Sequence, residues 1–318
     1  MKKISVVVPT YNEEANVEPL TDAIVNVMTG ELPEYDYEII FIDNHSNDST
    51  RQKLREICAK NKKVKAIFNA RNFGQLRSPV HGLKQAYGDC VVRLNADFQD
   101  PVELIPTFVR EWEKGTKIVI GVKEKTDESV FMAFLRKTYY KIIRKITDIG
   151  HIENFTGYGL YDKAFVDVVR NLHDPNPYLR GIIAELGYDY TAIKYNRPKR
   201  KAGKSKNNFY SLYDIGMVGI TSYSKVLMRL ATFAGAIVAG LSIVIGIIYL
   251  VMKLIYWDRF TAGMAPVTIG MFFLGAVQIF FIGILGEYVL SINSRVLDRP
   301  LVIEEERINF EDNTPVNE

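Results

Sequence analysis

Residues 90–101 read Cys90-Val91-Val92-Arg93-Leu94-Asn95-Ala96-Asp97-Phe98-Gln99-Asp100-Pro101. The apolar run at the start predicts a buried strand. Oxygen-bearing side chains follow at its C-terminal end, where open α/β sheets bind ligands. If the extended backbone continues, Asn95, Asp97 and Gln99 point to one side. Their carboxylate and amide oxygens are hard ligands that suit Mg²⁺ or Mn²⁺. We therefore expect a cation here that holds a diphosphate.

The same stretch has a simpler interpretation as a polar turn. Asp100 would then be the N-cap of the next helix, and Pro101 would occupy the first helical position. These residues alone leave both interpretations open.

The composition restricts the class of protein. The 318 residues suffice for one sizeable α/β domain and a further segment. A formal net charge of +3 provides no global basic field, so we expect no nucleic-acid partner. The two cysteines, Cys58 and Cys90, lack metal-type spacing, which fits a reduced, cytosolic catalytic portion. Met1 leads directly into a strand-like run, so no signal peptide is expected.

Two long segments, Leu230 to Met252 and Met264 to Gly286, contain no charged residue. Each exceeds the length of about 20 residues that a helix needs to cross a bilayer, and a buried core helix is the alternative. By the positive-inside rule, the flanking basic residues place both termini and the part of the chain before these segments in the cytoplasm. We therefore expect a multi-pass protein of the cell (cytoplasmic) membrane. The flanking basic residues are Lys225, Arg229, Arg295 and Arg299.

Helical patterns separate five strand-like runs in the first part of the chain. Strands that alternate with helices form a parallel sheet with right-handed crossovers. The polar turns that follow the first, second and fourth runs should therefore meet at one edge. The runs are residues 4–8, 38–42, 64–68, 90–94 and 117–121.

Four motifs in this order resemble those of family 2 GT-A glycosyltransferases, and more narrowly those of polyprenyl-phosphate (dolichol-phosphate type) glycosyltransferases. They are Val8-Pro9-Thr10-Tyr11-Asn12-Glu13-Glu14, the turn from Asp43, Asn72-Phe73-Gly74-Gln75 and residues 95–101. The resemblance covers nearly the whole chain. It implies an α/β fold: a GT-A (Rossmann-like, mostly parallel sheet) catalytic domain over 1–225, followed by a two-helix transmembrane hairpin within 226–295 (helices at about 230–252 and 264–286) and a cytoplasmic acidic tail over 296–318.

The resemblance also implies a nucleotide-sugar site. Tyr11 offers a face for base stacking, Glu13 and Asp43 accept hydrogen bonds from base or ribose, and Asp97 can bind the cation. The implied nucleotide-binding positions are Pro9, Tyr11, Glu13, Asp43, Asn95 and Ala96. The implied ligands of Mg²⁺ or Mn²⁺ are Asp97, Gln99 and Asn95.

Two positions depart from the family pattern. The family usually has Asp where this chain has Asn95, which removes a charge from the metal site. A Gly-Asp-Phe-Arg-like motif, proposed to supply a base, aligns with residues 153–162, where its Asp falls on Gly157 and its Arg on Gly159. The alternative role for both glycines is a tight turn.

The identity of the catalytic base is therefore open. The implied acceptor is a lipid monophosphate with a second pKa of about 6, by analogy with phosphoserine, so it needs little help from a base. Asp97, Glu153 and Asp100 are the candidate catalytic residues.

Three segments are expected at the membrane surface. Residues 130–149 and 207–224 have apolar positions at helical spacing, which predicts juxtamembrane amphipathic helices. For 130–149, the alternative is an ordinary helix packed on the sheet. The basic run at residues 195–206 matches a family pattern for binding the diphosphate or lipid phosphate, against the alternative of a solvated loop. Its matching positions are Arg197, Arg200, Ser205 and Lys206.

The sequence as a whole predicts a membrane-bound inverting glycosyltransferase for cell-surface glycan synthesis, such as cell wall or O-antigen biogenesis. The expected donor is a nucleotide-diphosphate sugar, for example UDP-glucose. The expected acceptor is polyprenyl phosphate, undecaprenyl in a bacterium, within the lipid bilayer. Glycines in both spans allow close helix contacts within or between chains, so a homo-oligomer is one expected arrangement.

Two other functions stay open. A processive polysaccharide synthase shares the GT-A domain but needs more spans and a Gln-x-x-Arg-Trp motif, and neither Trp112 nor Trp257 has that context. A non-catalytic nucleotide-sugar-binding membrane scaffold is the second alternative, because of Asn95 and Gly157.

Overall fold

The computed structural model describes residues 1–124, 152, 154–196, 198, 217–219, 221–222, 226–256, 264–297, 299–312 and 314. The predicted helix at 130–149, Glu153 and the matching residues of the basic run lie outside these ranges. Of the predicted helix at 207–224, residues 217–219 and 221–222 are described and are helical.

The described residues form one eight-stranded sheet in the order β7-β5-β6-β4-β1-β2-β3-β8. Its strands are β1 (Lys3–Thr10), β2 (Asp36–Asp43), β3 (Val64–Asn69), β4 (Cys90–Arg93), β5 (Ile118–Lys123), β6 (Phe155–Asp162), β7 (Tyr190–Tyr195) and β8 (Glu304–Ile308). The strand β1 pairs in parallel with β2 and β4, and β2 pairs in parallel with β3. This arrangement confirms the predicted mostly parallel α/β domain.

Both faces of the sheet carry an apolar core, because alternate residues of each central strand point to opposite sides. Val6 and Phe41 belong to one core, and Val7 and Ile42 belong to the other. The first core packs against α1 (Val17–Gly30), α2 (Thr50–Lys60) and α4 (Ile105–Glu113), which follows the short turn η1 (Val102–Leu104). The second packs against α3 (Gly74–Lys84), α6 (Lys163–Arg170) and α7 (Leu179–Leu186).

The sheet differs from the prediction beside β4. The run at 117–121 forms β5 but does not pair with β4, because β6 lies between them and is antiparallel to both. The alternative of a tight turn at Gly157 and Gly159 is wrong, since both residues lie within β6. Gly159 permits a close approach: a Cβ there would lie 2.4 Å from the carbonyl oxygen of Val119. The sequence pattern did not predict β6, because this strand contains two glycines and glycine is depleted in strands.

The C-terminal segment also differs from the prediction of a separate acidic tail. Glu304–Ile308 forms β8, which pairs antiparallel with β3 at the edge of the sheet. Arg55 forms an ion pair with Glu306 at 2.6 Å, and Asn309 donates hydrogen bonds to the carbonyl oxygens of Cys58 and Val64. Acidic side chains of this segment form ion pairs with basic side chains of α2, so the segment is part of the domain.

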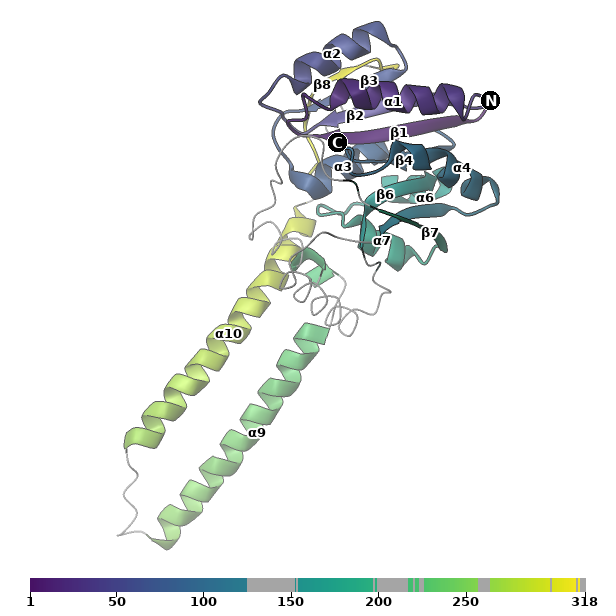
Figure 1. The fold of residues 1–318 in the computed structure, drawn as a ribbon. Helices are drawn as coiled ribbons and strands as arrows, with labels where there is room; N and C mark the ends of the chain where they lie inside the picture. The colour runs from purple at the N-terminus through teal and green to yellow at the C-terminus, as the bar shows by residue number, and fades with distance from the viewer. Residues whose placement is uncertain are drawn as a thin grey trace.

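Two long apolar helices precede β8. They are α9 (Val226–Ile255) and α10 (Met264–Val296), which extend beside each other away from the sheet (Figure 1). Met228–Ile255 and Ile269–Val296 are long and apolar enough to cross a membrane, and their apolar windows are 0% buried. That exposure does not fit the alternative of a buried core helix.

Candidate functional site

The turns after β1 and β2 are joined by hydrogen bonds at the carboxyl edge of the sheet. The backbone N–H of Asn12 donates to Oγ of Ser46 at 2.8 Å, and the N–H of Asn47 donates to Oδ1 of Asn12 at 2.8 Å. The N–H of Glu13 donates to Oγ1 of Thr50 at 2.8 Å. Because β4 is the other neighbour of β1, the turn after β4 leaves the same edge. The predicted convergence of the three turns is therefore confirmed.

Each of these turns contains a non-glycine residue with positive φ. The values are 54° for Asn12, 64° for His45 and 56° for Phe98. For a bulky residue such as phenylalanine this conformation is a true outlier. Backbone strain of this kind tends to cluster at ligand sites, so it supports the assignment of this edge as the functional site.

Asp43 closes the turn after β2. Its carboxylate is fully buried and accepts hydrogen bonds from the backbone N–H (3.0 Å) and the hydroxyl of Ser46. Nε of Arg51 lies 3.7 Å from Oδ2 of Asp43. Burial is the main reason that the pKa of Asp43 is raised above its ordinary value. The carboxylate therefore has a structural role in the turn, and its contact with base or ribose stays a prediction.

The turn after β3 joins the same network. Oδ1 of Asn44 accepts from the N–H of Phe73 at 2.9 Å, and its Nδ2 donates to Oδ1 of Asn72 at 2.9 Å. The backbone of Gly74 has φ of +86°. This contact explains why the Asn72-Phe73-Gly74-Gln75 motif is near the site: it holds the β2 turn. The sequence identified the motif but not Asn44, its partner.

Asp100 organises the turn after β4. Its Oδ2 accepts from the backbone N–H (3.0 Å) and Nδ2 (2.7 Å) of Asn95, and its Oδ1 accepts from the hydroxyl of Tyr195 at 2.9 Å. The carboxyl is fully buried, and burial raises its pKa. The N-cap of η1 is Pro101 and has no side-chain hydrogen bond. The interpretation of Asp100 as the N-cap of the next helix is therefore wrong, because its carboxylate points back to Asn95.

The strand does not continue through the metal-binding residues. β4 ends at Arg93, and the backbone turns at residues 96–98. The premise that Asn95, Asp97 and Gln99 alternate along an extended backbone is wrong. The turn instead brings the N–H of Gln99 to 3.2 Å from Oδ1 of Asp97.

The donor set of this turn fits a cation that is shared with a substrate. Asp97 is 5% exposed, and Asn95 and Gln99 are half-buried. Within the described part of the chain, no group of three His, Cys, Asp or Glu residues could hold a metal. Mg²⁺ commonly binds one or two carboxylates together with substrate phosphates. One carboxylate and two amides therefore suit Mg²⁺ or Mn²⁺ that is completed by a diphosphate.

The nucleotide-binding candidates lie around this edge. Pro9, Tyr11 and Glu13 are half-buried, and Ala96 is buried. Oε2 of Glu13 accepts a hydrogen bond from Nδ2 of Asn16 at 2.6 Å. The structure thus brings these candidates together with Asp43, Asn95 and Asp97, while Glu153, Arg197, Arg200, Ser205 and Lys206 lie outside the described ranges.

Arg93 is a residue of this site that the sequence analysis missed. It is the last residue of β4, is 8% exposed, and donates from Nη1 to the carbonyl oxygen of Thr156 at 3.1 Å. Burial lowers the pKa of its guanidinium. A signal was present in the sequence, because an arginine interrupts an apolar strand immediately before Leu94 and Asn95.

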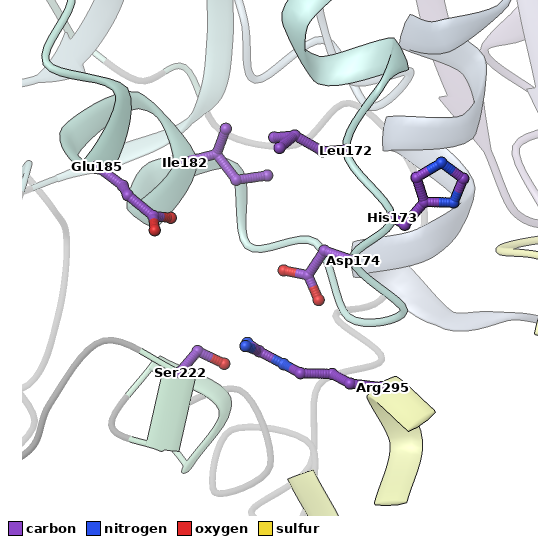
Figure 2. Close-up of a pocket in the computed structure, with 7 residues that line it drawn as sticks. All are labelled: Leu172, His173, Asp174, Ile182, Glu185, Ser222 and Arg295. Carbon is purple, nitrogen blue, oxygen red and sulfur yellow. The ribbon is translucent and has the colours of Figure 1, made fainter. Parts of the chain in front are cut away.

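A cavity of about 210 Å³ lies elsewhere, between the α6–α7 connection, α7 and the end of α10 (Figure 2). Asp174 and Arg295 point toward one another across it (Figure 2). Its lining residues are Leu172, His173, Asp174, Ile182, Glu185, Ser222 and Arg295. None of them belongs to the polar turns, so the cavity is a feature of the junction with α10.

Comparisons with known proteins identify the family of the chain. The family model described as Glycosyl transferase family 2 matches residues 5–169. The bactoprenol glucosyl transferase of Shigella phage SfII is 32% identical over 304 residues, which cover 95% of this chain and 97% of that protein. The uncharacterized glycosyltransferase YkcC of Bacillus subtilis is 31% identical over 308 residues, which cover 96% of this chain and 94% of that protein.

Among solved structures, glucosyl-3-phosphoglycerate synthase from Mycobacterium tuberculosis, in complex with Mn²⁺, UDP-glucose and glycerol 3-phosphate, is similar at a TM-score of 0.49 and 19% identity. The match covers 69% of this chain and 78% of that one. The family model and the relatives that match almost from end to end show that this chain is a glycosyltransferase of family 2.

Proposed function

We propose that the protein transfers a hexosyl residue, with glucose the first candidate, from a UDP-sugar to the phosphate of a membrane polyprenyl lipid. The observation that carries the proposal is the union of two features in one chain. Three polar turns lie at the carboxyl edge: those after β1 and β2 are hydrogen-bonded to each other, and the one after β4 carries Asp97. Two long apolar helices follow in the same polypeptide. Relatives named bactoprenol glucosyl transferase match across both parts, which supports this acceptor class.

In this proposal the donor lies across the carboxyl edge of β1, β2 and β4. Tyr11 stacks on the base, and Glu13 and Asp43 face base or ribose groups. Asp97, Gln99 and Asn95 hold Mg²⁺ or Mn²⁺ on the diphosphate. When bound, the cation neutralises charge on the leaving group. Asp100 keeps this turn in place through Asn95.

The transfer needs no covalent enzyme intermediate. An oxygen of the lipid phosphate attacks the anomeric carbon and forms the new bond, while the bond from that carbon to the UDP oxygen breaks and UDP leaves. One displacement inverts the anomeric configuration. A phosphate with a second pKa of about 6 is largely dianionic at neutral pH, so positioning matters more than proton removal. Asp97, Glu153 and Asp100 stay candidates for a base, but the proposal requires none.

The path of the chain supports one membrane topology. β8 follows α10 in the chain and belongs to the same sheet as β1. If α9 and α10 both cross the bilayer, the two ends of the hairpin lie on the side of the catalytic domain. Basic flanks at Arg229 and Arg295 favour the cytoplasmic side. We propose that the basic run, with Arg197, Arg200, Ser205 and Lys206, meets phosphates at this surface.

The test is transfer of radiolabelled sugar to a short polyprenyl phosphate. The full-length protein in detergent is assayed with UDP- and GDP-sugars and with Mg²⁺, Mn²⁺ or EDTA. We expect a chloroform-soluble product that carries one sugar per lipid, with inverted anomeric configuration by NMR. The product is lost in EDTA and in Asp97→Ala. Asp22→Ala, an exposed change on α1, is the matched control.

Two outcomes would contradict the proposal. Nucleotide binding without any product, with all donors, would favour the scaffold. A polymer of many sugars would favour a processive synthase.

A further inference from the structure

The guanidinium of Arg93 is buried without a full set of partners. Nη1 donates to the carbonyl oxygen of Thr156, but among the described residues Nε is buried and has no hydrogen-bond acceptor. Arginine keeps its charge in proteins and offers five N–H donors. A buried donor without an acceptor costs free energy, so such a group needs an explanation.

The side chain of Arg93 reaches toward the candidate site. In the sheet register, Arg93 lies opposite Gly159 of β6. Its Nη1 nevertheless contacts the carbonyl of Thr156, three residues nearer the start of β6. Because β6 is antiparallel to β4, the start of β6 lies at the carboxyl edge of β4. The charge is therefore displaced toward the edge where the turn of Asn95 and Asp100 begins.

Gly157 makes room for this guanidinium. Its φ is +91°, and a Cβ at this position would lie 1.4 Å from Nη1 and 2.7 Å from Cζ of Arg93. A side chain at position 157 and the guanidinium of Arg93 therefore exclude each other. Where the family resemblance implied an acidic side chain, this chain carries a cation.

No acidic side chain neutralises this cation directly within the described ranges. Asp100 is the nearby carboxylate and attracts Arg93 electrostatically, but both of its oxygens accept hydrogen bonds from Asn95 and Tyr195. Arg180 adds a second positive charge to the surroundings of Arg93. An anion at this point would receive a charge-assisted hydrogen bond, which is stronger than a neutral one.

We propose that Arg93, whose guanidinium occupies the space left by the missing side chain of Gly157, binds a phosphate group of the transfer reaction. This inference rests on the proposed function only in identifying which substrate carries the phosphate. Either the acceptor monophosphate or the donor diphosphate offers the same oxygens, and the experiment separates the two. In this assignment the group at this position binds the nucleophile or the leaving group and removes no proton.

Equilibrium binding tests this assignment without turnover. Thermal-shift titrations of the full-length protein use inorganic phosphate, UDP with Mn²⁺, and a short polyprenyl monophosphate. In Arg93→Met we expect at least one dissociation constant to rise about tenfold to a hundredfold, the usual effect of losing a charge-assisted hydrogen bond. Weaker binding of the polyprenyl monophosphate alone identifies the acceptor, and weaker binding of UDP identifies the donor. Arg93→Lys, which keeps the charge, should retain part of the affinity.

The matched control is Arg170→Met. Arg170 is also partly buried and donates to carbonyl oxygens, those of Lys84 and Ala86, at the opposite edge of β4. The Arg170→Met variant should have a lower melting temperature but the same dissociation constants as the wild type. If Arg93→Met behaves in the same way, Arg93 is structural and the inference is wrong.

A second variant addresses the case in which Arg93→Met does not fold. Gly157→Ala leaves Arg93 in the sequence but displaces its guanidinium, so the same ligand should lose affinity. Unchanged affinity in a folded Gly157→Ala would overturn the inference. Failure of sugar transfer with all donors, while phosphate binding still depends on Arg93, would refute the proposed function alone.

Discussion

Nε2 of His81 on α3 lies 2.6 Å from Oε1 of Glu304 on β8, and both side chains are buried. Arg307 completes this cluster, with Nη2 at 2.7 Å from the same oxygen of Glu304. The strand that follows the second apolar helix is therefore attached to the helix that follows β3. This contact joins the C-terminal part of the chain to the half of the sheet that contains β1, β2 and β3.

Glu304→Ala should destabilise the protein by about 3–5 kcal/mol, because removal of one partner leaves Arg307 buried without its counter-charge. Unfolding by urea, followed by tryptophan fluorescence in detergent, measures the loss. Glu311→Gln, an exposed change in the same segment, should stay within about 0.5 kcal/mol of the wild type. Equal stability of the two variants would show that β8 adds nothing to the domain.

Glu38→Gln should show a stability loss that depends on pH. Burial acts to raise the pKa of Glu38, but hydrogen bonds from Lys65, Ser5 and Lys3 together lower it below the ordinary value of 4.5. A lowered carboxyl pKa stabilises the fold above 4.5, and the benefit disappears as pH falls through the folded-state pKa. We expect the variant to lose about 1–3 kcal/mol at pH 7.

Urea unfolding of both proteins at several pH values checks this prediction. The difference between them should shrink steadily below pH 4.5. A difference that is constant with pH would mean that the ionised carboxylate does not stabilise the fold.

Tyr195→Phe should weaken binding of UDP with Mn²⁺. The hydroxyl of Tyr195 donates to Asp100, which in turn holds Asn95 in the turn of Asp97. Loss of one such bond to a charged group corresponds to roughly a tenfold rise in the dissociation constant. Isothermal titration calorimetry measures it, and Tyr190→Phe, an exposed change on the same strand, should have no effect. Unchanged affinity in Tyr195→Phe would show that the hydrogen bond between Tyr195 and Asp100 does not support binding of UDP with Mn²⁺.

Asn95→Asp should destabilise the protein in the absence of metal, although the family usually has Asp here. Nδ2 of Asn95 donates to Asp100 at 2.7 Å, so an aspartate would replace a hydrogen bond by a repulsive contact. We expect a loss of about 1–3 kcal/mol. Added Mn²⁺ should raise the melting temperature of the variant more than that of the wild type, because the extra carboxylate attracts the cation.

The control for this variant is Asn26→Asp, an exposed change on α1 that should leave both measurements unchanged. A variant as stable as the wild type without metal would show that the Asn95–Asp100 contact is unimportant.

Cysteine labelling should test the membrane topology. Cys58 and Cys90 are buried, and burial raises the pKa of Cys58 to about 12, so the wild type should react little with an impermeant maleimide. In oriented membrane vesicles, Thr314→Cys should react only from the cytoplasmic side, and Thr261→Cys only from the other side. Labelling of both from one side would mean that α9 and α10 do not form a membrane-spanning hairpin.

Local patterns in the sequence predicted much of the fold. The four runs that became β1 to β4 are apolar, and helical periodicity separates them, so their parallel order follows from the short crossovers. The lengths of the two uncharged segments predicted α9 and α10. The polar turns after three strands were predicted to meet, because the carboxyl ends of parallel strands share one edge, and they do.

Contacts between distant residues decided the rest. β8 pairs with β3, although more than 230 residues separate the two strands in the sequence. The acidic side chains of β8 acquire their basic partners only when α2 and α3 are packed on the sheet. Gly157 and Gly159 resemble a turn in sequence, whereas the structure uses them for close approach in a strand. The guanidinium of Arg93, on β4, fills the space beside Gly157, on β6, so this contact joins two strands.

The sequence by itself therefore determined the parallel half of the sheet, the two apolar helices and the edge where the polar turns meet, because periodicity and composition are local properties. Only the tertiary structure decided that β6 lies between β4 and β5, that Asp100 points back to Asn95, and that a buried arginine lies at that edge. Strand order and side-chain direction depend on which surfaces pack and which polar groups find partners, and no local pattern encodes that choice.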